Sequence, residues 1–186
     1  MRIIFRDLNP QVAAAVAEAF ADVPEVDAAC ADIFTAGPAD AIISPANSFG
    51  RMVGGIDAVY VRKFGSGLQD IVTLAFCKQP CGLLPVGKAV VVPTGSANIP
   101  RMISAPTMRV PGPVADTRNA YLAFRAALWC AQDYGFETLL CPGLATLCGR
   151  MAPDESARQM RRAWDHVVAG NEFPDRRPCT TAAVGL

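Results

Sequence analysis

The sequence predicts a layered α/β/α domain, and three observations support this prediction. Short apolar segments typical of strands alternate along the chain with longer segments typical of helices. The strand candidates are almost wholly apolar, as is usual for strands covered on both faces. Hydrophobic residues make up 52% of the 186 residues, and a chain of this length can bury a sizeable core as one domain.

The first half of the chain supplies one strand, one clear helix and then further strands. The segment "RIIF" predicts an opening strand, and Asn9 followed by Pro10 is the expected cap and first residue of a helix over residues 10–23. A second helix is expected in "AVYVRKFG", which begins at Ala58. The short apolar segments predict strands over residues 25–33, 39–44, 89–94 and 101–106.

The second half predicts two amphipathic helices around one strand. A helix is expected over residues 116–134, with Gly135 as its C-terminal cap, and "ETLLCPG" follows as a strand. Pro153 begins the last helix. The residues expected to face the core are Tyr121, Phe124, Leu128 and Ala131 in the first helix, and Met160, Ala163, Trp164 and Val167 in the second. We expect one domain over residues 1–170 and a loose tail over 171–186.

Composition argues against several classes of function. The 17 basic and 17 acidic residues balance, so no net field favours nucleic acid or a membrane surface. No apolar run is long enough to span a bilayer, and no export signal is evident. We therefore expect a cytoplasmic monomer.

The cysteines point to neither disulfides nor a metal site. Seven cysteines without an export signal indicate reduced thiols, which we expect to be buried or half-buried. The spacing of Cys77 and Cys81 is not that of a zinc knuckle, and the single histidine, His166, lies far away on a helix. We expect no metal and no cofactor, and we interpret His166 as a structural or surface residue.

Two glycine-containing segments lead from a strand into a helix, "SPANSFGRMVGGID" and "CPGLATLCGRMAPDE". A helix N-terminus offers unpaired N–H groups to an anion, and glycines let backbone amides approach phosphate oxygens. Side by side, the two segments could hold a pyrophosphate; alternatively, the glycines only form tight turns. The chain has no GxGxxG, no P-loop and no nucleophile elbow, which disfavours a dehydrogenase, an NTPase or a serine hydrolase.

Four motifs in the same order resemble those of the macrodomain superfamily, which binds ADP-ribose. "ADIF" resembles the family's "GDIT", "DAIISPANSFG" resembles "DAIVNAAN", "GGID" resembles "GGVD", and "CPGLATLCGRM" resembles the second phosphate loop. The resemblance covers roughly residues 2–168 and points to a bacterial or phage-like branch. It implies a mixed central sheet and ADP-ribose, or an ADP-ribosylated substrate, as the ligand.

The resemblance also implies roles for individual residues. Asp32 and Ile33 match the residues that face adenine, and Asn47 matches the asparagine that holds the distal ribose beside Ser48 and Phe49. From the residues alone, the simpler interpretation of Asp32 is a residue that caps a turn, and Asn47 could equally form an Asx-turn. The matches to the two phosphate-facing loops are Gly54, Gly55 and Ile56, and then Gly143, Leu144, Ala145, Thr146, Leu147, Cys148, Gly149 and Arg150.

The role of Asp57 decides whether the resemblance implies catalysis or only binding. In family members that hydrolyse ADP-ribosyl linkages, the matching aspartate directs a water molecule at the distal ribose. The resemblance therefore implies catalysis by Asn47 and Asp57, with O-acetyl-ADP-ribose as another possible substrate. Alternatively, Asp57 only caps a helix that begins at Ala58.

The chain departs from the family pattern in two places that bear on catalysis. The second loop has Ala145 to Leu147 where many members have "GTG", and Val61 replaces a histidine common one turn after the aspartate. These changes favour the alternative of a module that binds ADP-ribosyl groups without turnover.

Overall fold

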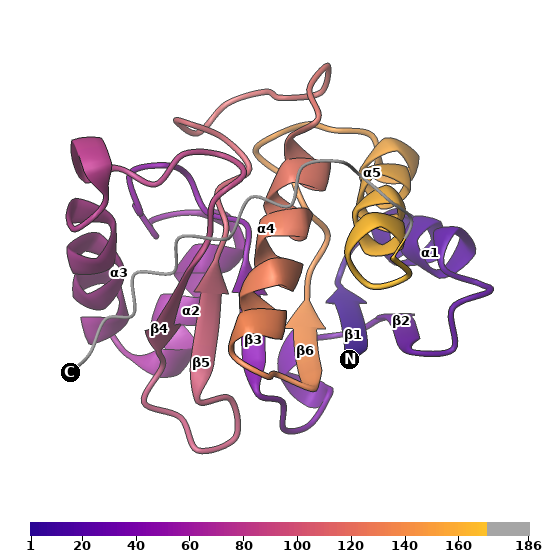
Figure 1. Cartoon of the computed structure of the whole chain (residues 1–186), viewed down its shortest axis with the longest axis horizontal. Helices are drawn as coiled ribbons and strands as arrows, with labels where there is room; N and C mark the ends of the chain where they lie inside the picture. Colours follow the sequence, from indigo (N-terminus) through magenta and orange to yellow (C-terminus); the bar gives the residue numbers. More distant parts are fainter. Residues whose placement is uncertain (171–186) are drawn as a thin grey trace.

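A mixed six-stranded sheet lies between two layers of helices (Figure 1) in the computed structural model, which describes residues 1–170. The strand order is β2-β1-β6-β3-β5-β4, and every neighbouring pair is parallel except β4 with β5. This confirms the predicted fold class. The strands are β1 (Arg2–Asp7), β2 (Val26–Cys30), β3 (Ala41–Ser44), β4 (Val90–Pro93), β5 (Arg101–Ser104) and β6 (Thr138–Cys141).

Side-chain alternation along the strands divides the core between the two layers. Ile43 faces the first layer and Ile42 the second, because neighbouring strand residues point to opposite faces. The first layer consists of α1 (Pro10–Ala19), α4 (Asn119–Asp133) and α5 (Pro153–Val167). The second consists of α2 (Gly55–Phe64) and α3 (Gly67–Cys77), with the short 3-10 turns η1 (Ile33–Thr35) and η2 (Pro80–Gly82) beside them.

Most residues predicted to begin helices, end them or face the core from them do so in the structure. Asn9 Oδ1 accepts a hydrogen bond from Gln11 N–H, and Pro10 is the first residue of α1. Gly135 follows α4 with a φ of 68°, a conformation that favours glycine. The predicted core faces of α4 and α5 are buried, and Pro153 begins α5.

Several boundaries differ from the predictions. α1 ends at Ala19 because Phe20 leaves the helix and packs against Phe5 and Trp164. β2 ends at Cys30 and, as an edge strand, is only half-buried. α3 was not predicted, since "GSG" before it is typical of a loop. The predicted tail lies outside the described residues, and none of the helices within residues 1–170 is long and apolar enough to cross a bilayer.

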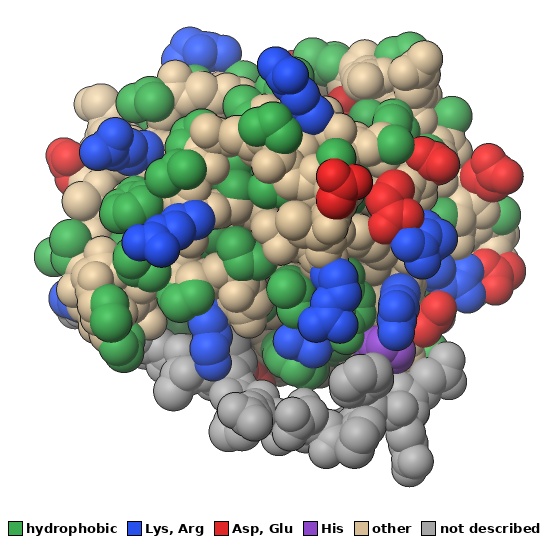
Figure 2. All heavy atoms as spheres, turned by 90° about the horizontal axis from the view of Figure 1, so that it is seen from above, with side chains coloured by type: hydrophobic (Ala, Val, Ile, Leu, Met, Phe, Trp, Pro, Cys, Tyr) green, Lys and Arg blue, Asp and Glu red, His purple; other side chains and the backbone are tan. Residues whose placement is uncertain are grey.

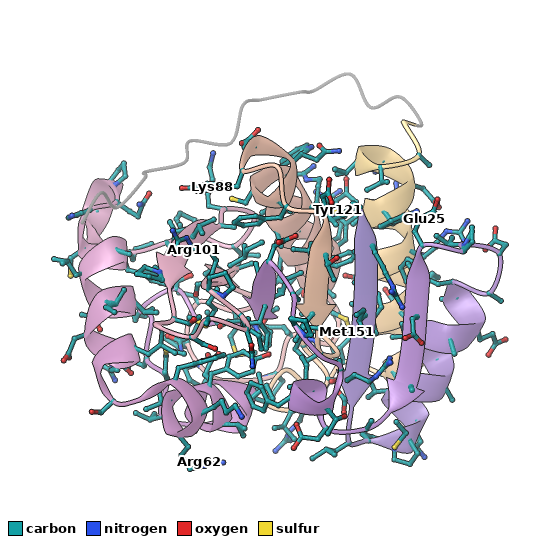
Figure 3. All side chains as sticks on the ribbon, turned by 90° about the horizontal axis from the view of Figure 1, so that it is seen from below. Glu25, Arg62, Lys88, Arg101, Tyr121 and Met151 are labelled. Atoms are coloured by element: carbon teal, nitrogen blue, oxygen red, sulfur yellow. The ribbon has the colours of Figure 1, made fainter. Side chains whose placement is uncertain are left out.

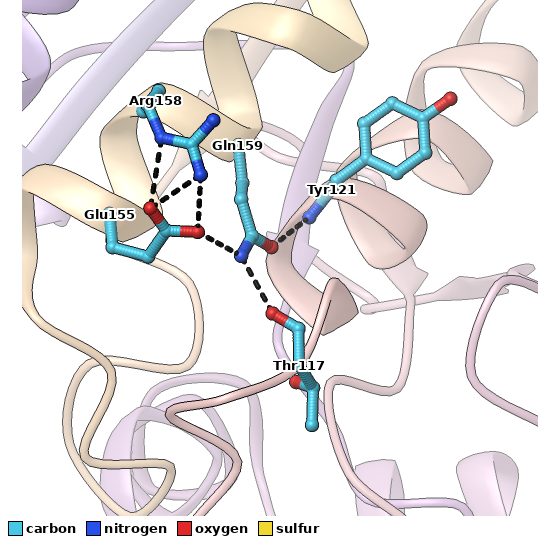
Figure 4. Close-up of polar contacts among 5 residues, drawn as sticks. All are labelled: Thr117, Tyr121, Glu155, Arg158 and Gln159. Atoms are coloured by element: carbon cyan, nitrogen blue, oxygen red, sulfur yellow. Dashed lines mark hydrogen bonds and ion pairs between the residues drawn. The ribbon is translucent and has the colours of Figure 1, made fainter.

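Gln159 joins the start of α4 to α5 (Figure 4). Its side-chain oxygen accepts a hydrogen bond from Tyr121 N–H (3.1 Å), and its amide nitrogen donates to Thr117 O and to Glu155 (2.7 Å each). Tyr121 itself lies between α4 and α5 (Figure 3), where its hydroxyl is 3.0 Å from His166 Nδ1. A buried amide therefore satisfies backbone groups at the N-terminus of α4 that would otherwise have no partner.

Replacing Gln159 by leucine should destabilise the protein by about 1–3 kcal/mol, because Tyr121 N–H and Thr117 O lose their buried partner. Urea unfolding followed by circular dichroism measures this. Arg158→Ala is the matched control one residue away, and it should cost less than about 1 kcal/mol because its ion pair with Glu155 is exposed. Equal losses in the two variants would contradict the role given to Gln159.

Candidate functional site

A cavity of about 710 Å³ lies at the carboxyl ends of the parallel strands. The segments that follow β1, β2, β3, β5 and β6 all contribute to its walls. Ligands of open α/β sheets bind at this edge, and the volume is within the usual range of roughly 300–1,000 Å³. Figure 2 looks onto this end of the molecule, where most acidic side chains gather over the side of α1 and α5.

One wall of the cavity is the start of α2, and this start carries no side-chain cap. Gly54 precedes the helix, and no side chain within residues 1–170 accepts a hydrogen bond from its first turn. Gly55 has a φ of 59°, so glycine is required there for the chain to enter the helix. The N–H groups of the first turn therefore remain available to an anion in the cavity.

Asn47 is buried in the cavity wall and holds its own loop together. Its Oδ1 accepts hydrogen bonds from Phe49 N–H (3.1 Å) and Arg51 N–H (3.3 Å), and its Nδ2 donates to Arg51 O (2.8 Å). The Asx-turn interpretation of Asn47 is thus correct. Nδ2 carries a second N–H, which takes part in none of these bonds.

Asp57 is the third residue of α2 and is buried at the bottom of the cavity. The helix begins at Gly55, not at Ala58 as predicted, so Asp57 lies inside the first turn and does not precede the helix as a cap. Ser44 Oγ donates a hydrogen bond to Asp57 Oδ1 (2.6 Å). Burial raises the pKa of Asp57 to about 6, and the bond from Ser44 opposes this increase.

Asp32 lies in another part of the same cavity and caps the turn η1. Its Oδ1 accepts a hydrogen bond from Phe34 N–H (2.9 Å), as the turn interpretation predicts. The side chain is nevertheless exposed and lines the cavity together with Ile33. The cap uses one carboxylate oxygen, so the other can still accept from a ligand.

The glycines of the second loop serve close packing. A Cβ at Gly143 would lie 2.4 Å from Val12 Cγ1, and Gly143 N–H donates to Asp7 Oδ2 (3.1 Å). A Cβ at Gly149 would lie 2.3 Å from Ala145 O. Ala145 itself takes a φ of 61°, which a residue with a side chain rarely adopts. The second loop is therefore tightly packed, and its glycines allow close contacts rather than flexibility.

The two loops meet at the mouth of the cavity. Leu147 is largely exposed, and its Cδ2 lies 3.6 Å from where a Cβ on Gly55 would be. The start of α5, by contrast, does not line the cavity, so of the two glycine-containing segments only the first presents a helix N-terminus there. This corrects the expectation that both segments act through a helix start.

The structure brings most of the expected site residues together, but not all. Asp32, Ile33, Asn47, Gly54, Gly55, Ile56 and Asp57 line the cavity with Gly143, Ala145, Thr146, Leu147, Cys148 and Gly149. Four expected residues do not line it: Ser48, Phe49, Leu144 and Arg150. Ser48 and Leu144 point into the core instead, while Phe49 and Arg150 are exposed elsewhere.

Sequence reasoning missed the contribution of β1 and of the segment after β5. Arg6, Asp7 and Asn9 line the cavity, as do Thr107 and Met108. Arg6 is paired with Asp27 (2.7 Å), whereas Arg51 is an exposed cation in the wall without an ion pair among the described residues. The position of Asp7 at the end of a strand is a signal that could have indicated its place in the site.

Other candidate groups lie outside this cavity. A second, polar hollow contains Arg118, Arg158 and Arg162 with Gln159, and His166 is near it through Tyr121. Within residues 1–170, no cluster of His, Cys, Asp or Glu side chains is arranged to hold a metal ion. The cysteines of that range are free, but the expectation of burial is wrong for Cys30, Cys77, Cys81 and Cys148, which are exposed.

Asp57→Asn should stabilise the protein at neutral pH. Between about pH 4 and 6 the folded protein retains a proton that the unfolded chain has lost, so stability falls as the pH rises through this window. The variant lacks this penalty, which is about 2–3 kcal/mol at pH 7.5 and disappears below pH 4. Unfolding in urea at both pH values measures the difference, with the exposed Asp116→Asn as control; equal effects at both pH values would contradict it.

Two known proteins are similar to this chain in sequence. The chain is 36% identical over 122 residues to an uncharacterised protein of Aquifex aeolicus, covering 66% of this chain and 70% of that one. It is 35% identical over 125 residues to an uncharacterised protein of Aeropyrum pernix, covering 67% of this chain and 63% of that protein's length.

Three solved structures share the fold at low sequence identity. The macrodomain of Mycobacterium tuberculosis DarG has a TM-score of 0.62 at 20% identity, over 74% of this chain and 88% of that one. The Oceanobacillus iheyensis macrodomain with ADP has 0.62 at 16%, over 72% of each chain. Thermosipho africanus DarTG in complex with ADP-ribose has 0.60 at 18%, over 72% of this chain and 36% of that one.

A family model described as "Macro domain" matches residues 43–160, a range that contains the first loop, α2 and the second loop. This match covers more than half of the chain, and the chain belongs to the Macro domain family.

Proposed function

We infer that the cavity binds ADP-ribose or a close derivative. The observation that carries this proposal is the uncapped start of α2, which faces a cavity that Asp32 also lines. The N–H groups of Gly55 and Ile56 suit the pyrophosphate, and the spare oxygen of Asp32 suits the exocyclic amine of adenine. Related folds are known with ADP and with ADP-ribose, which supports the same ligand class here.

Two further residues complete the proposed binding mode. Asn47 retains one N–H of Nδ2, which would donate to a hydroxyl of the distal ribose. Arg51, which Asn47 holds through its backbone, brings a positive charge to the wall. Because Arg6 is neutralised by Asp27, Arg51 is the cation we expect to attract the diphosphate.

We further propose that Asp57 directs hydrolysis of an ADP-ribosyl linkage. A water molecule held by its carboxylate would attack the anomeric carbon of the distal ribose. As the new carbon–oxygen bond forms, the bond to the acceptor breaks, the acceptor leaves with the electron pair, and the proton of the water passes to Asp57. No metal is needed for this step.

One observation favours the second candidate, a module that binds without turnover. Val61, at the position of the family's common histidine, does not line the cavity, and His166 lies outside it. Asp57 would then be the only buried acid or base there, with no second group to protonate a poor leaving group.

Calorimetric titration with ADP-ribose tests the binding proposal. The wild-type protein should bind, and Asp32→Ala should weaken binding about 10- to 100-fold, because one hydrogen bond to a charged acceptor is lost. The same substitution should leave the affinity for ribose 5-phosphate unchanged, since that ligand lacks adenine. Leu74→Ala, on the exposed surface of α3, is the control; no heat from the wild type at millimolar ligand would refute the proposal.

Incubation with a mono-ADP-ribosylated protein tests catalysis. Release of ADP-ribose should increase as the pH rises through about 6, because only ionised Asp57 accepts a proton from water. Asp57→Ala should abolish release while ADP-ribose still binds. Binding without release by the wild-type protein would establish the non-catalytic alternative.

A further inference from the structure

Two buried serines end neighbouring strands below α2, and only one of them has a partner. Ser44 of β3 and Ser104 of β5 are paired in register, and their exposed fractions are 0% and 1%. Both follow the alternation that directs Ile42 and Met102 toward the α2 layer. Ser44 Oγ donates to Asp57 Oδ1, whereas Ser104 Oγ has no partner among the residues that the structure describes.

Ser44 is the only side chain of residues 1–170 that donates a hydrogen bond to Asp57. Tyr60, one turn further along α2, donates its hydroxyl to Ile43 O instead (3.1 Å). The thiol of Cys141, on β6, is directed to Pro142 O. Neither of these buried groups therefore stabilises the carboxylate.

The charged groups nearest to Asp57 also give it no compensating contact. Asp7, at the end of β1, accepts from Asn9 N–H and Gly143 N–H, and it carries the same charge. Arg6, Arg51 and Asp32 line the same cavity, but none of them contacts Asp57 in the structure. Burial without a cation raises the pKa of Asp57, and the Ser44 hydroxyl is the group that lowers it.

We propose that Ser44 is a positioning residue for Asp57, whose Oδ1 it holds so that Oδ2 faces the cavity as the acceptor for a ligand or water. This proposal rests on the proposed function of the same cavity. Because a hydroxyl has a single proton, Ser44 donates it to the ionised carboxylate and thereby favours the charged form. Ser44 stands where the family motif "DAIVNAAN" has an asparagine.

The geometry also explains why Asp57 is fixed in one orientation. Oδ1 is tied to the end of β3 and the backbone belongs to the first turn of α2, so both ends of the side chain are anchored to rigid elements. A carboxylate free to rotate would present either oxygen, or turn away from a ligand. Positioning by a strand residue removes that freedom before the ligand arrives.

The test compares Ser44→Ala with Ser104→Ala, two substitutions at paired positions of equal burial. NMR titration of ligand-free protein with ¹³C-labelled aspartate follows Asp57. In Ser44→Ala the midpoint should move to higher pH by about one to two units, as expected for the loss of one hydrogen bond to a charge. In Ser104→Ala it should not move, because no bond is lost.

Two further variants separate positioning from general loss of structure. Ser44→Thr retains the hydroxyl and should restore the wild-type midpoint, and Ser44→Cys, a weaker donor, should fall between wild type and alanine. Cysteine also provides the test if Ser44→Ala does not fold. An unchanged midpoint in Ser44→Ala or Ser44→Cys, or an equal change in Ser104→Ala, would overturn the proposal.

Failure of this proposal can be told apart from failure of the proposed function. The NMR titration needs no ligand, so it tests the link between Ser44 and Asp57 even if ADP-ribose does not bind. Where ADP-ribose is released, the rising limb of the pH–rate profile should move with the NMR midpoint in Ser44→Ala. A limb that stays in place while the midpoint moves would show that Ser44 does not act through Asp57 in turnover.

Discussion

The parallel pairing of β1, β6, β3 and β5 decides where the cavity of this protein lies. It brings the ends of these strands to one edge of the sheet, so the segments that follow them must meet there. Asp7 reinforces this convergence, because its two carboxylate oxygens accept from the loop after β1 and from the loop after β6. The cavity is therefore a consequence of strand direction, and the loops determine only its chemistry.

The chemistry at that edge conflicts with stability. Asp57 is a carboxylate with a single hydrogen bond, and the apolar layer under α2 favours its neutral form. A protein selected for stability alone would have an apolar residue in the first turn of α2. The chain instead has an acid there, with a serine to hold it. A merely structural interpretation of the cavity does not explain this feature.

Much of the fold could be predicted from the sequence, because apolar strands, Asn9 and Gly135 act through their immediate neighbours. Contacts between distant segments could not. Gly143 looks like a phosphate-binding glycine, yet the space beside it is filled by Val12 of α1. Phe49 is expected beside the distal ribose but lies outside the cavity, and the bond from Ser44 to Asp57 joins a strand end to a helix start. Only the packed structure fixes such relations.

The two loops of the site consequently differ in kind. The first keeps its helix start uncapped and uses Asn47 to hold Arg51 in place, so its polar groups are directed toward the cavity. The second is held by backbone bonds within itself: Met151 N–H donates to Ala145 O, and Arg150 N–H donates to Leu147 O. At the mouth the second loop contributes the apolar side chain of Leu147, next to Gly55, and Thr146 and Cys148 also line the cavity. In the proposed binding mode, the groups at the start of α2 that would hold the diphosphate and direct water therefore belong to one short segment, from Asn47 to Asp57, whereas Asp32 would hold adenine from the segment after β2.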